Sequence, residues 1–276
     1  MMQYSVLMSL YKKENPEWFC EAVESILKQT VKPDEIVIVE DGLLTNELEN
    51  KVKYYENKYE KIFKIVRNSE NHGLGFALNC GLKECRNEIV ARMDTDDISV
   101  INRCDIELKY LEQNSNTVLV GSNVYEFSDN INNILDKRVV PTSYEDIYKF
   151  AKKRNPFNHP TVMFRKSAVL EVGGYSALRY GQDYELFGRM LIKGYRLENI
   201  DQCLLYFRRD EKTFEKRKNK ESIRCYIETV KEFKRQGFSS WKDVMFVITS
   251  QTILSVLPSS VISLLYKIVR CKDEKK

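Results

Sequence analysis

Residues 88–97 read EIVARMDTDD, an apolar run followed by three aspartates within four positions. The run is short, partly β-branched and ends abruptly, which is typical of a buried strand. Negative charges are costly to gather beside a buried strand unless a cation or other partners compensate them. The stretch therefore predicts a strand with a cation-binding acidic loop at its carboxyl end, and the simpler alternative is an acidic turn.

The sequence before this stretch alternates apolar runs with amphipathic ones. Strands are predicted at residues 4–10, 35–39, 62–66 and 88–93, and helices at residues 15–30, 48–59 and 74–82. Asn15 is a good N-cap, and Pro16 suits the first helical position. This order predicts a largely parallel sheet with helices on both faces. Because ligands bind beyond the carboxyl ends of such strands, Asp41 and Asp94 are expected at the same edge.

The second half of the chain is less regular. Strands are predicted at residues 117–127, 138–140 and 203–209, a strand and then a helix at 158–169, and a loop and then a helix at 181–194. Ser143 and Asp146 resemble a capping box for a short helix, and Gly194 suits the position after a helix end. Because there is no internal repeat and no low-complexity linker, the two halves are expected to form one continuous body.

The composition excludes several classes of protein. The 276 residues include 44 basic and 40 acidic side chains, and a formal net charge of +4 gives no general basis for nucleic-acid binding. Seven scattered cysteines without a CxxC pair, and only two histidines, indicate reduced thiols of a cytosolic protein rather than a zinc site. The first residues are expected to form a strand, not a signal peptide. No apolar segment reaches the roughly 18 uninterrupted residues of a membrane span.

The acidic loop suits a hard divalent cation. Mg²⁺ and Mn²⁺ favour carboxylate oxygens, usually one or two of them together with substrate phosphates. Asp94 and Asp96 project to the same side of an extended chain, because side chains alternate along it. Asp97 is expected either to cap the helix that begins near Ile101 or to face solvent.

Four motifs appear in the order VESILKQTVKPDEIVIVEDG, NHGLGFALNCGLKEC, ARMDTDD and GQDYELF. They resemble the inverting family 2 of glycosyltransferases, from about Tyr4 to about Arg209. The stretch NPFNHPTVMFRKSAVLEVGGY resembles the bacterial subgroup that builds capsule, O-antigen and exopolysaccharide repeat units. The resemblance implies an α/β protein of the GT-A fold, with a mostly parallel sheet flanked by helices. It implies a catalytic domain at 1–210, with a nucleotide-binding half at about 1–120 and an acceptor-binding half at about 121–210, and a helical extension at 211–276.

The resemblance also implies a nucleotide site. The residues implied to line it are Leu10, Tyr11, Glu14, Asp41, Asn71, Gly73, Ala77, Asn79 and Asp94. Glu40-Asp41 departs mildly from the family pattern but keeps its second acid, which is implied to contact the base or ribose. The alternative for Asp41-Gly42 is a plain turn.

The stretch NHGLGFALNCG is implied to close over the nucleotide. A helix that starts at Gly73 would direct free N–H groups at an anion. Ordinary helix packing is the alternative for Ala77. Asn79 is polar within an otherwise apolar helix, so it needs a hydrogen-bond partner.

The same family pattern implies how the transfer would work. Asp94 is implied to contact the ribose, and Asp96 is implied to bind the Mn²⁺ or Mg²⁺ ion that bridges the diphosphate. Inversion requires a base for the acceptor hydroxyl, and Asp183 is implied in that role. The family often has Glu-Asp there and this chain has Gln182-Asp183, which leaves one acid. The alternative is that Asp183 caps a helix beginning at Tyr184.

Further contacts with the acceptor or the diphosphate are implied for His159, Gln182, Arg209 and Arg217. A lone histidine is more often structural, and the basic stretch around Arg209 and Arg217 more often forms a solvated surface.

The implied reaction moves a hexose or N-acetylhexosamine from a nucleotide diphosphate sugar, in this case UDP-linked, to a hydroxyl of a saccharide on polyprenyl diphosphate. It would take place at the cytoplasmic face of the membrane, in surface polysaccharide biosynthesis. The alternatives are a sugar nucleotidyltransferase, which would want a glycine-rich phosphate loop, and a non-catalytic nucleotide-sugar-binding module. The first loop, SLYKKENPEW, has no glycine.

Residues 241–276 are densely apolar and end in basic side chains. Pro258 interrupts the run, so the segment is too broken for a membrane span. An amphipathic helix on an anionic membrane surface fits this pattern. A helical pair packed on the catalytic domain, or a homodimer contact, fits it as well.

Overall fold

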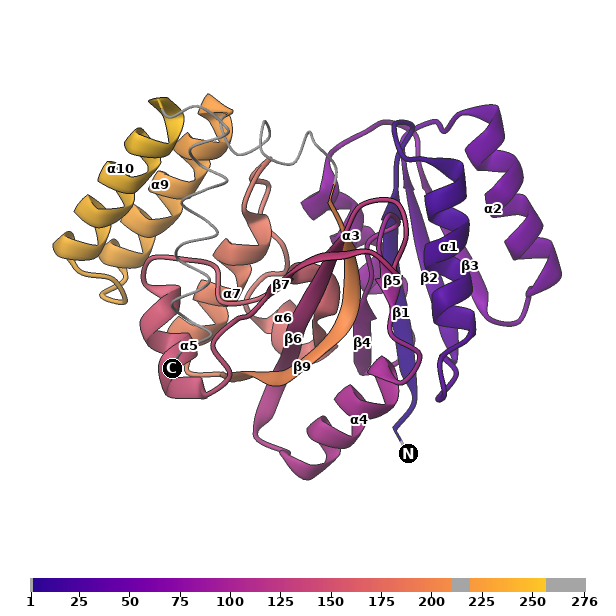
Figure 1. Ribbon diagram of the computed structural model, residues 1–276, viewed down its shortest axis with the longest axis horizontal. Coiled ribbons are helices and arrows are strands. Elements are labelled where there is room, and N and C mark those ends of the chain that lie inside the picture. The colour runs from indigo at the N-terminus through magenta and orange to yellow at the C-terminus, as the bar shows by residue number, and fades with distance from the viewer. Residues whose placement is uncertain (1, 210–218, 257–276) are drawn as a thin grey trace.

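The computed structural model describes residues 2–209 and 219–256. A nine-stranded sheet runs through the molecule, with helices on both faces (Figure 1). The strands are β1 (Tyr4–Leu10), β2 (Glu35–Asp41), β3 (Phe63–Asn68), β4 (Ile89–Arg92), β5 (Ile98–Ser99), β6 (Thr117–Phe127), β7 (Ile134–Arg138), β8 (Met163–Arg165) and β9 (Arg196–Arg208). The helices are α1 (Pro16–Leu27), α2 (Asn46–Lys58), α3 (Leu74–Glu84), α4 (Arg103–Gln113), α5 (Tyr144–Ala151), the 3₁₀ turn η1 (His159–Thr161), α6 (Lys166–Glu171), α7 (Gln182–Ile192), α9 (Lys220–Arg235) and α10 (Trp241–Val256).

The strand order is β3-β2-β1-β4-β8-β6-β9-β5, and β7 pairs with β6. The four strands predicted for the first half are confirmed and are all parallel. The rest of the sheet is mixed, because β8 runs antiparallel to both β4 and β6 while β9 is parallel to β6. The carboxyl ends of β1, β2, β3 and β4 therefore share one edge of the sheet.

Alternation along the strands sends side chains into two cores. In β1, Leu7 faces a core built with α3, α5, α6 and α7, while Val6 and Met8 face a core built with α1, α2 and α4. β2 divides in the same way, with Val37 on the first side and Ile38 on the second. A strand buried on both faces reads as a continuous apolar run, which explains the sequence pattern.

The predicted helix ends are largely confirmed. The Asn15 side chain accepts hydrogen bonds from two backbone N–H groups of the first turn of α1, and Ser143 caps α5. Gly194 follows α7 with a φ of 91°, a conformation that glycine adopts without strain. The strand predicted at 138–140 is wrong, because β7 ends at Arg138 and the N–H of Val140 donates instead to the side chain of Asn123.

The two last helices pack against the body of the protein at the end of the molecule opposite α2 (Figure 1). Gly188 of α7 lies directly under the ring of Phe233 of α9, where an added Cβ would meet the ring at 1.9 Å. Val244 and Val247 of α10 are buried in the same core. Residues 241–256 therefore pack with α9 on the domain, which is the helical-pair alternative given for this segment. Residues 257–276 lie outside the described part of the chain.

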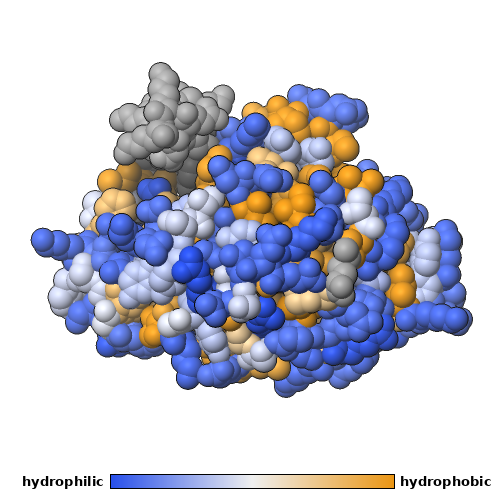
Figure 2. Space-filling view, turned by 90° about the horizontal axis from the view of Figure 1, so that it is seen from below, coloured by the Kyte–Doolittle hydropathy of each residue, from blue (hydrophilic) through white to orange (hydrophobic). Residues whose placement is uncertain are grey.

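The surface seen from below Figure 1 is mainly hydrophilic, with apolar residues in small patches (Figure 2). Within residues 2–209 and 219–256, we find no helix whose length and apolar character would let it cross a membrane.

Candidate active site

The acidic loop leaves the carboxyl end of β4, between the ends of the strands and the start of β5. One carboxylate oxygen from each of Asp94, Asp96 and Asp97 lies within 4.8 Å of the others. Asp94 and Asp96 are partly open to solvent, and Asp97 is fully buried. Three hard oxygens gathered this closely suit a divalent cation such as Mn²⁺ or Mg²⁺.

Asp97 does not take either of the positions expected for it. It neither faces solvent nor caps α4, which begins at Arg103. Its Oδ1 accepts the backbone N–H of Arg208 at 2.8 Å, and its Oδ2 has no hydrogen-bond partner in the described structure. Burial raises the pKa of Asp97 well above its ordinary value, and the nearby charges of Asp96 and Asp94 raise it further.

Arg92, the last residue of β4, places a guanidinium under this loop. Its side chain is 1% exposed and forms an ion pair with Asp94 through Nη2. Its Nε and Nη1 atoms are buried, and neither has a hydrogen-bond partner among the described residues. A buried arginine with two unmet donors is rare in a folded protein.

Asp183 lies in the first turn of α7, which begins at Gln182 and not at Tyr184 as the capping alternative requires. Its Oδ2 accepts a hydrogen bond from Asn155 Nδ2 at 2.7 Å. Burial raises the pKa of Asp183, while hydrogen bonds from backbone N–H groups and Asn155, and the charge of Arg92, act in the opposite direction. A carboxylate with a raised pKa is a better proton acceptor, as a general base requires.

His159 and Tyr175 flank the same region. His159 Nε2 lies 3.0 Å from the hydroxyl of Tyr175, and the His159 ring packs edge-on against the rings of Tyr175 and Phe187. Burial lowers the pKa of His159 well below its ordinary value, and the charge of Arg92 lowers it further, so the ring is neutral. Gln182 is also buried, and its Oε1 has no partner in the described structure.

Tyr11, in the loop after β1, lies near enough to the acidic loop for the charge of Asp96 to act on its hydroxyl. Its ring is partly exposed, and burial raises the pKa of its hydroxyl with contributions from the charges of Glu14 and Asp96. The side chains of Leu10 and Ala77 are instead fully buried in the two cores. These two side chains are not open to a ligand in this structure.

Asp41 ends β2 and holds the loop that leads into α3. Its carboxylate accepts the backbone N–H groups of His72 at 3.1 Å and Gly73 at 2.8 Å. Asn71 Nδ2 donates to the carbonyl of Asp41 at 3.0 Å, and Gly42 turns with a φ of 86°. Asp41, Asn71 and Gly73 therefore lie together at the carboxyl edge, and Asp41 has the structural role that a turn predicts.

Asn79 has the partner that its position in an apolar helix demands. Its Nδ2 donates to the carbonyl of Tyr175 at 2.7 Å, and its Oδ1 accepts the N–H of Tyr175 at 2.8 Å. Both ends of the amide are used, so Asn79 clamps the Tyr175 loop to α3.

Arg208 connects β9 to the acidic loop. Besides its N–H bond to Asp97, its Nε donates to the carbonyl of Asp96 at 2.8 Å, and its guanidinium packs on the rings of Trp18 and Phe127. Arg209 is instead paired with Glu126 at 3.5 Å. Arg217 lies outside the described residues.

Three residues at this site escaped the sequence interpretation. Arg92 left a signal, namely a charged residue inside an apolar strand. Tyr175 ends the stretch NPFNHPTVMFRKSAVLEVGGY, whose resemblance implied no role for it. Asn155 begins the stretch NPFNHPTVMFRKSAVLEVGGY, where no role was implied for its amide.

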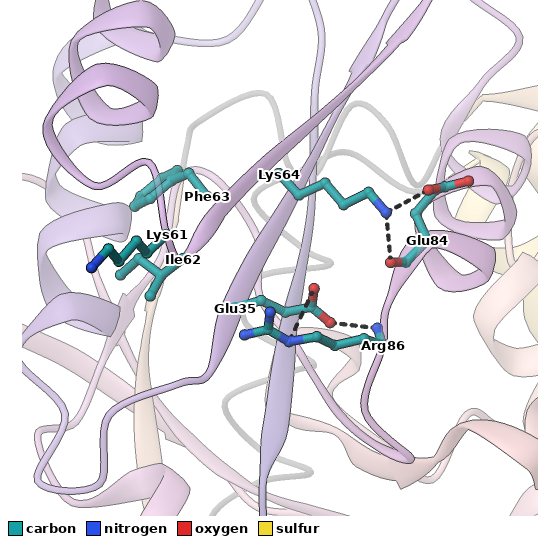
Figure 3. Close-up of a pocket in the computed structure, with 7 residues that line it drawn as sticks. All are labelled: Glu35, Lys61, Ile62, Phe63, Lys64, Glu84 and Arg86. Atoms are coloured by element: carbon teal, nitrogen blue, oxygen red, sulfur yellow. Dashed lines mark hydrogen bonds and ion pairs between the residues drawn. The ribbon is translucent and has the colours of Figure 1, made fainter.

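A hollow lies at the opposite, amino edge of the sheet (Figure 3). The residues that line it are Glu35, Lys61, Ile62, Phe63, Lys64, Glu84 and Arg86. Four of its charges are paired: Lys64 Nζ lies 2.6 Å from Glu84 Oε2, and Arg86 Nε lies 3.9 Å from Glu35 Oε2. This hollow is remote from the acidic loop.

Comparison with known proteins resolves the class of this chain. The sequence model of glycosyl transferase family 2 matches residues 5–174, a range that includes the acidic loop and His159. The chain belongs to glycosyl transferase family 2. It is accordingly a glycosyltransferase, and not a sugar nucleotidyltransferase or a non-catalytic binding module. Asp183 lies beyond the matched range.

Two bacterial relatives of this glycosyltransferase align over nearly their whole length. A UDP-Gal:alpha-D-GlcNAc-diphosphoundecaprenol beta-1,3-galactosyltransferase of Escherichia coli is 35% identical, over 96% of this chain and 95% of its own. The amylovoran biosynthesis glycosyltransferase AmsE of Erwinia amylovora is 36% identical, over 99% of both chains.

The GT-A fold is also confirmed by a solved structure. The mannosyltransferase PcManGT of Pyrobaculum calidifontis, in complex with GDP-Man and Mn²⁺, superimposes with a TM-score of 0.66 over 97% of this chain and 80% of its own. At 14% identity, this likeness concerns the fold alone.

Proposed function

We propose that this glycosyltransferase moves a sugar from a UDP-sugar to a hydroxyl of a lipid-linked saccharide, with inversion and with a divalent metal ion. One observation carries the proposal: the guanidinium of Arg92 pairs with Asp94 of the acidic loop and acts electrostatically on Asp183 of α7. Asp94 of the acidic loop and Asp183 of α7 are thus both within the electrostatic reach of one buried guanidinium, which supports the proposal.

In the proposed reaction the acceptor hydroxyl oxygen attacks the anomeric carbon of the donor sugar. A bond forms between these atoms as the bond from the anomeric carbon to the diphosphate oxygen breaks, and the hydroxyl proton passes to Asp183. The electron pair of the broken bond leaves with the nucleoside diphosphate. Because this is a single displacement, the configuration at the anomeric carbon inverts.

Asp96 is the residue that would hold Mn²⁺ or Mg²⁺, and Asp94 and Asp97 each place a carboxylate oxygen within 4.8 Å of one of its own. A bound divalent cation supplies positive charge to the leaving diphosphate. Arg208 supports this arrangement, because it hydrogen-bonds to the backbone of Asp96 and to the carboxylate of Asp97.

The names of the relatives support the rest of the proposal. The Escherichia coli relative acts on a diphosphoundecaprenol-linked acceptor with UDP-Gal, and AmsE serves amylovoran biosynthesis. We therefore assign this chain to bacterial surface polysaccharide biosynthesis at the cytoplasmic face of the membrane.

The test uses the chain, Mn²⁺, a panel of sugar nucleotides and a synthetic acceptor that carries a sugar on a lipid diphosphate. Asp183→Asn should lower turnover by about 10²–10⁴-fold while nucleotide affinity stays the same. Asp201→Asn, at an exposed position on β9, is the matched control and should leave turnover unchanged. Full turnover in Asp183→Asn would reject the assignment of the base.

We also propose that α10 touches the membrane. Trp241, Met245, Phe246 and Ile253 are exposed on α10, and Lys234 lies 4.5 Å from the ring of Trp241. Exposed apolar side chains beside lysines suit an anionic membrane surface. Deletion of the whole segment would uncover the core face of α9, so point substitutions make the sharper test.

The variant Trp241→Glu/Phe246→Glu should sediment less with vesicles of anionic phospholipid than the unaltered chain does. Thr252→Glu/Ser255→Glu places the same two charges at exposed polar sites of α10 and is the control. Equal sedimentation of all three proteins would refute membrane contact through this face.

A further inference from the structure

Two arginines are buried near the acidic loop, and they differ in how their donors are used. Arg103 Nε donates to Glu107 at 3.0 Å, its Nη2 donates to the carbonyl of Arg92 at 2.9 Å, and its Nη1 contacts the sulfur of Met93 at 3.5 Å. Every nitrogen of Arg103 therefore has a partner. Among residues 2–209 and 219–256, Arg92 has a side-chain partner for Nη2 alone.

The unmet donors of Arg92 require an explanation. Buried N–H groups of a charged side chain are nearly always hydrogen-bonded, because losing water without a replacement is costly. Nε and Nη1 of Arg92 are shielded from solvent and have no partner among the described residues. An acceptor from outside the described residues would satisfy these donors, and a bound ligand can supply it.

The position of Arg92 limits what this acceptor is. Its Nη2 pairs with Asp94 at the proposed diphosphate site, and its backbone N–H donates to the carbonyl of Val162 at 2.9 Å, directly after the 3₁₀ turn that carries His159. The His159 ring in turn packs against Phe187 of α7, the helix that carries Asp183 on the acceptor side. In a single displacement the sugar being transferred lies between the leaving diphosphate and the base. The part of the substrate that lies beside Arg92 is thus the transferred sugar, a placement that rests on the proposed function.

The chemistry of the donors favours neutral oxygens over a phosphate. The charge of Arg92 is already paired with that of Asp94. Nε–H and Nη1–H lie on different edges of the planar guanidinium, so a single phosphate or carboxylate cannot take both as a fork. Two separate neutral oxygens, from hydroxyl or N-acetyl groups, match this geometry.

A second unmet group lies near the base. The Oε1 of Gln182 is buried, has no partner within the part of the chain that the structure describes, and can only accept a hydrogen bond. Its side chain packs at the start of α3, where a Cβ on Gly75 would lie 3.5 Å from Gln182 Cγ. Sugar hydroxyls both donate and accept, so the same ring can supply a donor to Gln182 and acceptors to Arg92.

We propose that Arg92 is a specificity-determining residue that binds the transferred sugar, donating from Nε and Nη1 to two of its neutral oxygens while Nη2 holds Asp94. Arg92 then distinguishes a nucleotide sugar from the bare nucleotide, and one sugar from another by the positions of their oxygens.

The experiment measures affinity for matched pairs of ligands in the presence of Mn²⁺: UDP with UDP-galactose and UDP-N-acetylglucosamine, and GDP with GDP-mannose. The proteins are the full chain, Arg92→Lys, Arg92→Gln and the control Arg103→Lys, each checked for folding by circular dichroism. In the Arg92 variants, affinity for the accepted sugar nucleotide should fall by about tenfold to a hundredfold relative to its own nucleoside diphosphate. Arg103→Lys should lower thermal stability without changing that ratio.

A deoxy analogue of the accepted sugar sharpens the result. If Arg92 binds the missing hydroxyl, removing it should weaken binding to the unaltered chain but not to Arg92→Lys. The proposal is overturned if the Arg92 variants weaken the nucleotide and the sugar nucleotide by the same factor, or weaken neither. If the unaltered chain binds no sugar nucleotide at all, the proposed function itself fails, which is a different outcome.

Discussion

The two edges of the sheet both carry charged side chains, yet they differ in whether those charges are satisfied. At the amino edge, Glu35, Lys64, Glu84 and Arg86 are paired within the protein (Figure 3). At the carboxyl edge, charged atoms of Arg92 and Asp97 and polar atoms of Ser176 and Gln182 are buried without a partner among the described residues, whereas the amino edge leaves one neutral atom, Asn87 Nδ2, in that state. A hollow whose charges are paired within the protein needs no ligand to satisfy them, whereas buried polar atoms without a partner indicate that a ligand satisfies them.

The largest effect that would test this contrast is expected at Asp96. Asp96→Ala should lower turnover by about 10²–10³-fold, because charge on the leaving diphosphate loses its compensation. Nucleotide affinity should fall with it, and its dependence on Mn²⁺ should weaken. Steady-state kinetics and Mn²⁺-dependent nucleotide titration measure both effects. A variant with unchanged Mn²⁺ dependence would show that the acids do not form the metal site.

The pH dependence of the reaction should report the raised pKa of Asp183. The base must be ionised, so kcat/KM should fall about tenfold per pH unit below this pKa, and the midpoint should lie above that of an ordinary aspartate. Asn155→Ala removes a hydrogen bond that favours the ionised form, so it should move the midpoint to still higher pH. A midpoint that stays in place in Asn155→Ala would contradict the assigned contact.

A smaller effect is expected at the clamp between α3 and the Tyr175 loop. Asn79→Ala leaves the N–H and C=O of Tyr175 without their partners, which should cost about 1–3 kcal/mol of unfolding free energy. Denaturant unfolding measures the loss, and nucleotide titration tests the role implied by the family pattern. If stability is unchanged and only nucleotide affinity falls, Asn79 is a nucleotide ligand and not a clamp.

The smallest effect is expected at the amino edge. Glu84→Gln breaks an exposed ion pair with Lys64, and such pairs contribute little because water screens them. Turnover, nucleotide affinity and melting temperature should all stay close to those of the unaltered chain. A large loss of turnover would show that the amino edge takes part in the reaction, so that the two edges would not differ in function.

The sequence predicted the first half of the fold well because its signals are local. Apolar runs bounded by turns identified four parallel strands, and their order placed Asp41 and Asp94 at the same edge. The mixed half was harder, because β8 has only three residues and depends on β4 and β6 for its place. Short strands acquire their register from neighbours that are distant in the chain.

The site could be predicted in outline and not in its contacts. The aspartates were found because carboxylates cluster in the sequence, but the buried position of Asp97 depends on Arg208, more than a hundred residues later. The amide of Asn79 looked ready for a ligand and is used by Tyr175. Such pairings between distant residues leave no periodicity that one sequence can reveal.

The glycine at position 188 has a consequence beyond packing. α7 bears Asp183 near its start and Gly188 five residues later, about 7.5 Å along the axis, where Phe233 of α9 rests. The single helix α7 thus joins the proposed proton acceptor to the pair of helices α9 and α10. If α9 and α10 lie on the membrane, their tilt also sets the height of the Asp183 carboxylate above the bilayer. That height in turn determines which sugar of a lipid-linked glycan the carboxylate can reach.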